Sequence, residues 1–498
     1  MTIDTGWTKL IKKNVPQAFT QKLNEKPTTV FIDGQIKLMC GTHIRSWQQL
    51  VRSQFIQCIE SAFATGACIV VLAFDNYEHV PAAKNMTQAK RSKQHVHVDF
   101  DASDDLPALM PENWNACMRN RCFKNKVMHM IINTLRVHYT SGDVLQKQGR
   151  TVILDFVQPE VFGAAIKLPD AVTNDSGKRG ECDVKAFNWA CYGPMLIFST
   201  DGDYLMIALM QLERMQQTAT DNEIRHLGTN SMQCELRVKP KNRFITEQEY
   251  ITDADGESWT QQKPASMQRF YLWRMTTNID SCLKRKAESK TKQQYEYVNI
   301  QAVLAWLQQE MLKVGCVGLA SDNLASLVAA TGCDFCMSLP NVGPIKIWQQ
   351  RWAFKNLNLT SPLDLLQALS CVYATMYASK VPATVMQMKA MLNQNQSWLQ
   401  TTDKKEAYYD NYHDSAEFDA SLQHLTGAYD LLAQALQNNA NVSEVIKKRT
   451  WSHDRLRAHV LNAIWTLRYW MFLHDYPDPL TGFGFVRNKN RVEFEAAV

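Results

Sequence analysis

The sequence predicts an α/β fold with a mostly parallel sheet flanked by helices. Two apolar, β-branched runs, residues 29–32 and 68–74, have strand character, and an acid follows each of them directly. Residues 46–63, between the two runs, have apolar side chains at helical spacing. A strand, a helix and a second strand in this order form a parallel pair with a right-handed crossover.

Further along the chain, residues 151–157 and 195–198 have the composition of buried strands. Residues 128–137 form an apolar helix or strand, and 298–312 and 324–330 have helical spacing. From Trp352 to Tyr476 the pattern is helical throughout, so we expect a helical C-terminal region, 351–498, that ends in an extended or irregular tail.

Composition limits the classes of protein that need to be considered. The 498 residues carry a net charge of +5 and include thirteen cysteines. We find no apolar run of about 20 residues and no signal-peptide pattern, so we expect an intracellular protein, cytoplasmic or nuclear, with no membrane partner. Cysteines in such a compartment stay reduced. The mild excess of positive charge suits a polyanionic partner.

Acids stand where predicted strands end, which is the place where α/β sheets bind ligands. Asp33 and Asp75 follow the first two strands, and Asp201 and Asp203 follow the run 195–198. Glu181 and Asp183 open a predicted helix just before that run. Clustered carboxylates repel one another unless they bind divalent cations or keep their protons. Oxygen ligands favour Mg²⁺ or Mn²⁺, although a single Asp-x-Asp pair is more often a solvated surface turn.

Two further segments carry groups that suit phosphate. Lys84, Lys90, Arg91 and Lys93 lie in a helix-compatible run, which is either a phosphate-facing patch or a solvated helix face. Residues 339–344 form a tight turn after Asp334, and a helix begins at Ile345. Backbone N–H groups in such a turn can hold a phosphate or a monovalent ion, and the alternative is an ordinary connection between two helices.

The order of these segments resembles the flap-endonuclease (XPG-type) superfamily of structure-specific 5′ nucleases over roughly residues 1–350. Seven acids stand at the positions of that family's metal ligands, with Asp183 where Glu is usual: Asp33, Asp75, Glu181, Asp183, Asp201, Asp203 and Asp334. Lys84 and Arg91 have the spacing of the family's Lys and Arg at the base of the helical arch. Residues 339–346 are similar to its helix–two-turn–helix.

The resemblance implies a PIN-like nuclease core over 1–350, with an arch at about 80–130 and an insertion at about 206–295. It implies two Mg²⁺ ions, or Mn²⁺ in their place, bound by the seven acids, with Lys84 and Arg91 at the scissile phosphate. Asn341, Gly343 and Lys346, with Lys90 and Lys93, would contact nucleic acid, and the turn would hold K⁺. The implied activity is cleavage of DNA near 5′ flaps, nicks, ends or junctions in replication, repair or recombination.

Some features depart from the family and keep alternatives open. The family usually has a glycine immediately after the first Met, whereas the corresponding pair here is Gly6-Trp7. Asn341 stands where the family has a turn glycine, and we find no C-terminal clamp-binding box. Gly180-Glu181-x-Asp183-x-Lys185 resembles the motif of the Xrn-type 5′→3′ exoribonucleases, which would make RNA the substrate. A non-catalytic nucleic-acid-binding scaffold on a nuclease fold is the third reading. The divergence suggests a large DNA virus as the source.

Overall fold

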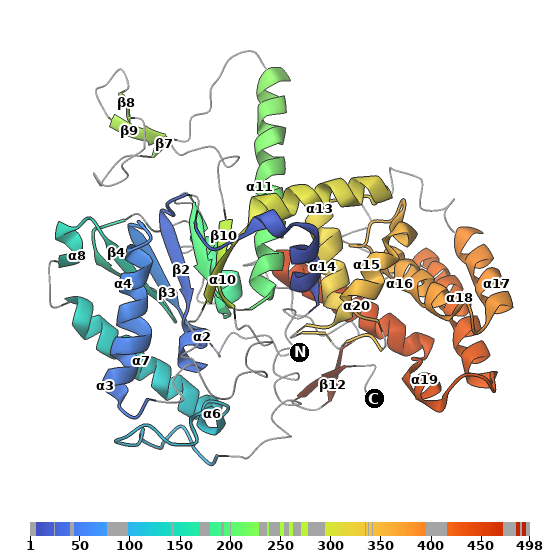
Figure 1. The fold of residues 1–498 in the computed structure, drawn as a ribbon, viewed down its shortest axis with the longest axis horizontal. Helices are drawn as coiled ribbons and strands as arrows, with labels where there is room; N and C mark the ends of the chain where they lie inside the picture. Colours follow the sequence, from blue (N-terminus) through green and yellow to red (C-terminus); the bar gives the residue numbers. More distant parts are fainter. Residues whose placement is uncertain are drawn as a thin grey trace. The chain divides into compact units, whose positions relative to one another are not determined.

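The structure is a computed structural model, and the description below is confined to part of the chain. It describes residues 6–23, 25–39, 44–76, 98–140, 144–166, 168, 180–190, 194–199, 201–228, 237–238, 250–252, 258–261, 270–276, 294–333, 335–336, 338–340, 342–394, 416–471, 485–488 and 491–494. These residues form two compact units (Figure 1). One unit, the sheet unit, comprises the described residues between Val15 and Val303; the other, the helical unit, combines the described residues up to Asn14 with those from Leu304.

The sheet unit is built on an eight-stranded mixed sheet with the order β1-β11-β10-β6-β2-β3-β4-β5. Its central strands are parallel: β10 (Phe270–Thr276), β6 (Met195–Phe198), β2 (Thr29–Asp33), β3 (Ile69–Ala73) and β4 (Thr151–Asp155). The edge strands β1 (Phe19–Thr20), β11 (Gln294–Asn299) and β5 (Pro159–Gly163) pair antiparallel. The expected α/β architecture is therefore confirmed, with a parallel centre and antiparallel edges.

Side chains that alternate along the central strands are buried on both faces of the sheet. Val30, Ile32 and Leu72 lie in a core cluster on one face. Phe31 and Val71, at the alternate positions, are also fully buried, because helices cover the other face. Each fully buried aliphatic or aromatic side chain contributes about 1.5–3 kcal/mol. A continuous apolar run such as 69–73 therefore suits a central strand, where helices cover both faces of the sheet.

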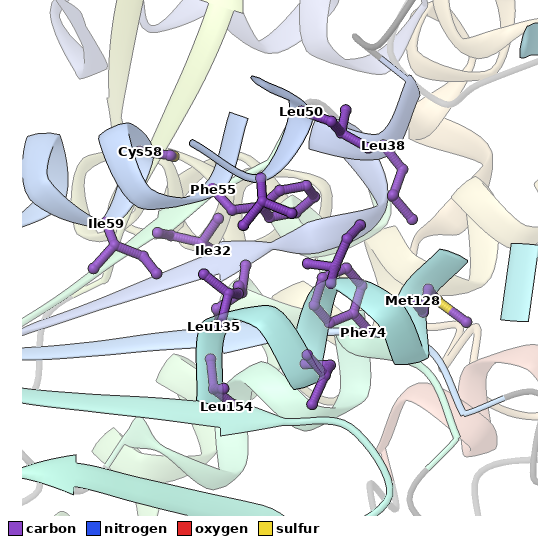
Figure 2. Close-up of a cluster of buried hydrophobic side chains, with 14 of the residues drawn as sticks. Ile32, Leu38, Leu50, Phe55, Cys58, Ile59, Phe74, Met128, Leu135 and Leu154 are labelled. Carbon is purple, nitrogen blue, oxygen red and sulfur yellow. The ribbon is translucent and has the colours of Figure 1, made fainter. Parts of the chain in front are cut away.

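One face is covered by helices that precede and follow β3 along the chain. They are α2 (Gly34–Met39), α3 (Trp47–Leu50) continued by the π-helical η4 (Val51–Ile56) and α4 (Gln57–Phe63), and then α6 (Trp114–Cys117), α7 (Arg121–Thr140) and α8 (Val144–Lys147). Figure 2 shows side chains of α4 and α7, such as Ile59 and Leu135, packed against Ile32 and Leu154 of the strands. The predicted helix at 46–63 is therefore present, and the ambiguous segment 128–137 is helical.

The other face carries α10 (Cys182–Asn188) and α11 (Asp203–Gly228). Phe31 of β2 packs against Tyr204 of α11, with ring centroids 6.4 Å apart. A separate three-stranded sheet has the order β7 (Arg237–Val238), β9 (Ser258–Gln261), β8 (Tyr250–Thr252). The range 206–295, expected as an insertion, also supplies β10 and the first two residues of β11 to the main sheet.

The helical unit contains α1 (Trp7–Asn14), α14 (Ala320–Thr331), α15 (Pro344–Gln349), the 3₁₀ helix η7 (Arg351–Phe354), α16 (Pro362–Tyr377), α17 (Pro382–Gln394), α18 (Ala416–Asn438), α19 (Glu444–Arg449) and α20 (His453–Met471), and α13 (Ile300–Val314) leads into it. Trp7 Nε1 of α1 donates to Thr331 Oγ1 of α14 at 2.8 Å. A hairpin of β12 (Phe485–Asn488) and β13 (Arg491–Phe494) lies in the tail, which was expected to be extended or irregular.

Parts of the expected architecture fall outside the described residues. Of the range expected as an arch, about 80–130, residues 80–97 are not described, and its later part includes α6 and the beginning of α7, both of which contribute to the core of the sheet unit. α14 and α15 flank the turn expected as a helix–two-turn–helix, in which Asp334 and Asn341 are not described. None of the helices in the described part of the chain combines the length and apolar character that crossing a membrane requires.

A buried histidine makes the stability of the helical unit sensitive to acid. His459 of α20 is almost fully buried, and its Nε2 donates to Ala330 O at 2.7 Å, so Nδ1 is left as the acceptor facing Cys336 Sγ at 3.5 Å. Burial lowers the pKa of His459 to about 4, helped by the charge of Arg455 and opposed by the bond to Ala330.

Because the folded-state pKa is below the unfolded value near 6.5, the stabilising contribution is present above pH 6.5 and is lost as the pH falls toward 4. We predict a loss of up to about 1.4 kcal/mol per pH unit in this window. Urea titrations from pH 7 to 4 should show a smaller slope for His459→Gln than for the control His424→Gln, which changes a half-buried histidine. Equal slopes for the two variants would contradict this assignment.

Candidate functional site

The register of the parallel strands brings their acids to one edge of the sheet. Asp33 is the last residue of β2 and lies opposite Ala73 of β3, which in turn lies opposite Asp155 of β4. Asp75 follows β3 after one residue, and Asp201 follows β6 closely. Ligands of α/β sheets bind at this carboxyl edge, so the acids predicted from the sequence stand where such a sheet builds a site.

A glycine fixes the turn that carries Asp33. The N–H of Gln35 donates to Asp33 Oδ1 at 2.9 Å as β2 passes into α2. A Cβ at Gly34 would lie 2.5 Å from Phe74 Cε1 and 2.7 Å from Ala73 O, closer than any side chain tolerates. The start of α2 therefore fits directly against the end of β3, which brings Asp33 toward Asp75.

Asp75 connects the end of β3 to the start of α10. Its Oδ1 accepts from the N–H of Cys182 at 2.9 Å, and the N–H of the next residue, Asn76, donates to Gly180 O at 2.6 Å. The carboxylate thus occupies the positive N-terminal end of α10. Glu181 and Asp183, at this same helix start, are buried, with 1% and 8% of their surface exposed.

A buried lysine anchors α10 to the ends of two strands. Lys185 Nζ donates to Phe74 O at 2.7 Å and to Phe156 O at 2.6 Å, the carbonyl groups just beyond β3 and β4. Asp155 Oδ1 lies 3.9 Å from the ammonium group, and Asp155 Oδ2 accepts from Trp189 Nε1 at 2.8 Å. Lys185 and Asp155 are almost completely buried.

Neither Lys185 nor Asp155 was singled out as a site residue from the sequence. The signal was present: Lys185 completes the spacing Gly180-Glu181-x-Asp183-x-Lys185, and Asp155 interrupts an apolar strand. A buried charge within such a run requires a partner, and the sequence alone does not say which of the many lysines supplies it.

The turn after β6 links Asp201 and Asp203 to Asp33. Ser199 Oγ donates to Asp33 Oδ2 at 3.4 Å and accepts from the N–H of Asp201 at 3.1 Å. The N–H of Asp203 donates to Asp201 Oδ1 at 3.3 Å, where α11 begins. Asp203 is buried, whereas Asp201 is partly exposed. Ser199 therefore ties the ends of β2 and β6 into one polar network.

The pKa of Asp33 shows that several of these acids influence one another. This pKa is raised to about 7, chiefly by burial and also by the charges of Asp75, Asp201 and Asp183, while the Gln35 N–H opposes the rise. Burial followed by the same kind of acidic neighbours also raises the pKa of Tyr204. Four of the seven predicted acids therefore share one electrostatic environment at the edge of the sheet.

The donor set fits a hard divalent cation in charge and in chemical type. Its oxygen atoms are the ligands that Mg²⁺ and Mn²⁺ prefer, and a cation would relieve the repulsion that raises the pKa of Asp33. Within the described ranges, however, no group of three or more His, Cys, Asp or Glu side chains is arranged to hold a metal ion.

The remaining predicted site residues either lie outside the described residues or belong to the helical unit. Lys84, Lys90, Arg91, Lys93, Asp334 and Asn341 lie outside the described residues. Gly343 is the N-cap of α15 and Lys346 is exposed on that helix, both in the helical unit. Their expected contacts with nucleic acid, and the K⁺ ion expected at this turn, stay predictions.

Comparison with known proteins adds no assignment to this geometry. No protein-family model matches the chain. No curated protein matches it either.

The crowding of acids at this edge should cost stability when no cation is present. Asp33→Asn removes one charge, and we expect it to raise the free energy of unfolding in EDTA at pH 8 by on the order of 2–4 kcal/mol. Because the folded-state pKa of Asp33 is raised to about 7, its unfavourable contribution develops as the pH rises from about 4 through 7. The gain from Asn should therefore be smaller at pH 5.

The measurement is urea unfolding of both proteins at the two pH values, with Asp105→Asn, a change at an exposed acid, as the control. A destabilised Asp33→Asn variant at pH 8 would show that Asp33 is not under charge repulsion.

Proposed function

We propose that this chain is a divalent-metal-dependent nuclease that hydrolyses phosphodiester bonds of DNA near 5′ flaps, ends or junctions. The observation that supports it best is the burial of mutually repelling carboxylates at the carboxyl edge of a parallel sheet. Retaining buried like charges is unfavourable unless a ligand compensates them. The order of these acids along the chain is that of the flap-endonuclease superfamily, so we propose that the sheet unit is its PIN-like core.

The chain's own residues would divide the work in a definite way. Asp33, Asp75, Glu181 and Asp183 would hold the more catalytic cation, and Asp201, Asp203 and Asp334 the second. When bound, such ions supply an activated water and stabilise the charge that develops on the phosphate. Asp75 keeps α10 in position through the N–H of Cys182, and Lys185 fixes the same helix from below.

Residues outside this edge would bind the substrate. Lys84 and Arg91 would neutralise the scissile phosphate, as electrostatic groups do at other phosphoryl sites. Lys90, Lys93, Asn341, Gly343 and Lys346 would contact the nucleic-acid backbone, with K⁺ at the turn before α15. The cell context that fits this activity is replication, repair or recombination, in the cytoplasm or nucleus, and for a large DNA virus.

An Xrn-type 5′→3′ exoribonuclease is the second candidate, supported by one feature of the structure. Lys185 completes the Gly-Glu-x-Asp-x-Lys spacing and is fully buried against the strand ends, so that spacing has a structural role in this chain. A non-catalytic scaffold is a weaker candidate, because a protein that never binds cations has no use for the repulsion around Asp33.

Substitution of the acids tests the proposal directly. We expect Asp201→Asn and Glu181→Gln each to slow Mg²⁺-dependent cleavage of a labelled 5′-flap DNA by at least about 10²-fold, because each removes a negative oxygen from the cation site. Binding of the same DNA, measured by fluorescence anisotropy in Ca²⁺, should change little. Asp105→Asn serves as the control, and wild-type turnover in both site variants would refute the assignment.

The choice between DNA and RNA needs substrates compared side by side. Flap DNA, nicked duplex and 5′-monophosphorylated RNA are incubated with the wild-type chain and Mg²⁺ under the same conditions. Cleavage of flap DNA supports the proposal, and stepwise degradation of RNA alone supports the exoribonuclease. Inertness toward all three, together with no heat of Mg²⁺ binding, leaves the scaffold.

A further inference from the structure

A basic and aromatic surface lies on the helical unit, on elements that the carboxylates do not use. Residues 6–14 and 342–358 contain no acid at all. Their charged residues and one exposed tryptophan define what we call the basic–aromatic surface: Lys9, Lys12, Lys13, Lys346, Arg351, Trp352 and Lys355. All of these side chains are exposed except that of Arg351, which is partly buried.

The two segments are packed together and so present their charges from one body. A Cβ on Gly6 would lie 2.5 Å from Pro344 Cγ, which shows how closely the start of α1 approaches α15. Trp7 meets Trp348 edge to face with ring centroids 6.4 Å apart. The apolar side of α1, with Trp7, Leu10 and Ile11, is buried, and its lysines therefore point outward.

Trp352 is held in place although most of its ring is in solvent. Its exposed fraction is 61%, and it is the only tryptophan among the exposed large hydrophobic residues in the described part of the chain. The Arg351 guanidinium carbon lies 5.4 Å from the Trp352 ring and 5.2 Å from that of Trp348. Arg351 also donates to Trp348 O at 3.1 Å, so it packs between two indoles.

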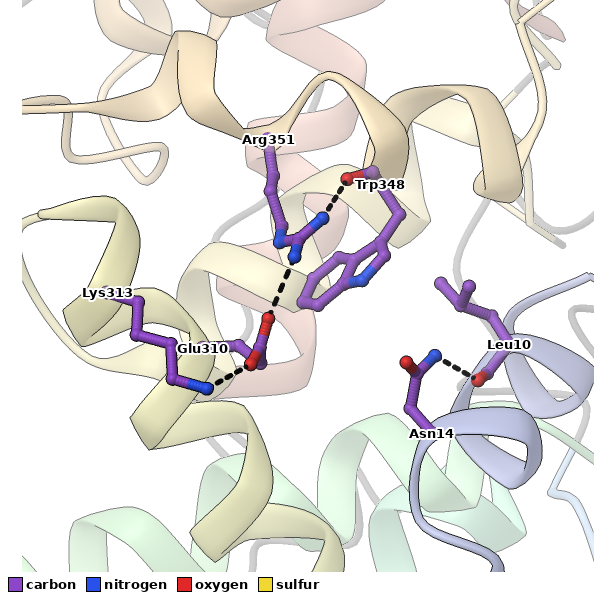
Figure 3. Close-up of polar contacts among 6 residues, drawn as sticks. All are labelled: Leu10, Asn14, Glu310, Lys313, Trp348 and Arg351. Atoms are coloured by element: carbon purple, nitrogen blue, oxygen red, sulfur yellow. Dashed lines mark hydrogen bonds and ion pairs between the residues drawn. The ribbon is translucent and has the colours of Figure 1, made fainter.

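Glu310 fixes Arg351 through an ion pair. Glu310 Oε2 accepts from Arg351 Nη2 at 3.0 Å and Oε1 from Lys313 Nζ at 2.8 Å, as Figure 3 shows. Burial raises the pKa of Glu310, but the hydrogen bonds and charges of Lys313 and Arg351 outweigh it, and the net pKa is lowered. The acid is thus ionised and paired with two cations.

We propose that the basic–aromatic surface binds single-stranded nucleic acid, with phosphates at the lysines and one base stacked on Trp352. An aromatic ring beside a track of cations is the arrangement by which proteins bind single strands without reading sequence. Bases of a duplex are already stacked on one another and cannot cover Trp352, and an acidic lipid surface would use the lysines without the ring. This surface is argued from its own charge and does not depend on the carboxylates.

Binding is measured with the full chain in EDTA, so that no cleavage occurs and the proposed activity plays no part. The probes are a fluorescein-labelled oligothymidylate of about 20 nucleotides and a duplex of the same length, titrated by anisotropy at several salt concentrations. The variants are Trp352→Ala, Trp352→Phe and the double change Lys12→Gln with Lys13→Gln. Leu109→Ala and Lys147→Gln, at exposed positions of the sheet unit, are the matched controls.

We expect Trp352→Ala to weaken single-strand binding about tenfold and duplex binding less than about twofold, with Trp352→Phe restoring most of the loss. The double lysine change should weaken binding and lower the salt slope by about 0.7 for each lost phosphate contact. The controls should leave both unchanged. Equal effects of Trp352→Ala on duplex and single strand, or no effect on either, overturn the proposal. Binding to vesicles of acidic phospholipid that matches the oligonucleotide in affinity also overturns it.

Discussion

The acidic edge depends on the contacts that the buried ammonium group of Lys185 makes. This group donates hydrogen bonds to two main-chain carbonyl groups, one just beyond β3 and one just beyond β4, and it lies beside the buried carboxylate of Asp155. A lysine removed from water in this way is stable only with such partners, so the contact is specific and not a general attraction. It holds α10 against the sheet, and α10 carries Glu181 and Asp183.

Around this anchor the structure places like charges close together. Asp33 is the last residue of β2, and Asp75 lies just beyond β3. Asp183 lies in α10, and Asp201 lies in the turn after β6. The charges of Asp75, Asp183 and Asp201 all raise the pKa of Asp33. The hydrogen bonds in the network come mostly from main-chain N–H groups and from Ser199, which orient oxygen atoms without neutralising them. Such an edge is destabilised by charge repulsion, so a bound cation would stabilise the fold.

Much of this edge follows from local sequence. Apolar runs of five or so residues ending in an acid predict parallel strands with carboxylates at one end, and β2, β3 and β6 fulfil this. The partner of Asp155 was not predictable, because the spacing along the chain does not reveal which lysine folds beneath it. The place of β10 in the main sheet was not predictable for a similar reason, since pairing of β10 with β6 joins segments far apart in sequence. The contact of Cys336 with His459 likewise depends on how helices pack.

The central claim is that Lys185 positions a carboxylate site that binds divalent cations, and Mn²⁺ titration calorimetry tests it most directly. The proteins are the wild-type chain, Lys185→Met and the exposed control Lys147→Met, each verified as folded by circular dichroism at the temperature used. We expect the wild-type and Lys147→Met chains to bind Mn²⁺ alike and Lys185→Met to bind it about 10–100-fold more weakly, the range found when a group supporting metal ligands is lost. A folded Lys185→Met variant with wild-type affinity, or a wild-type chain that binds no Mn²⁺, would contradict the account.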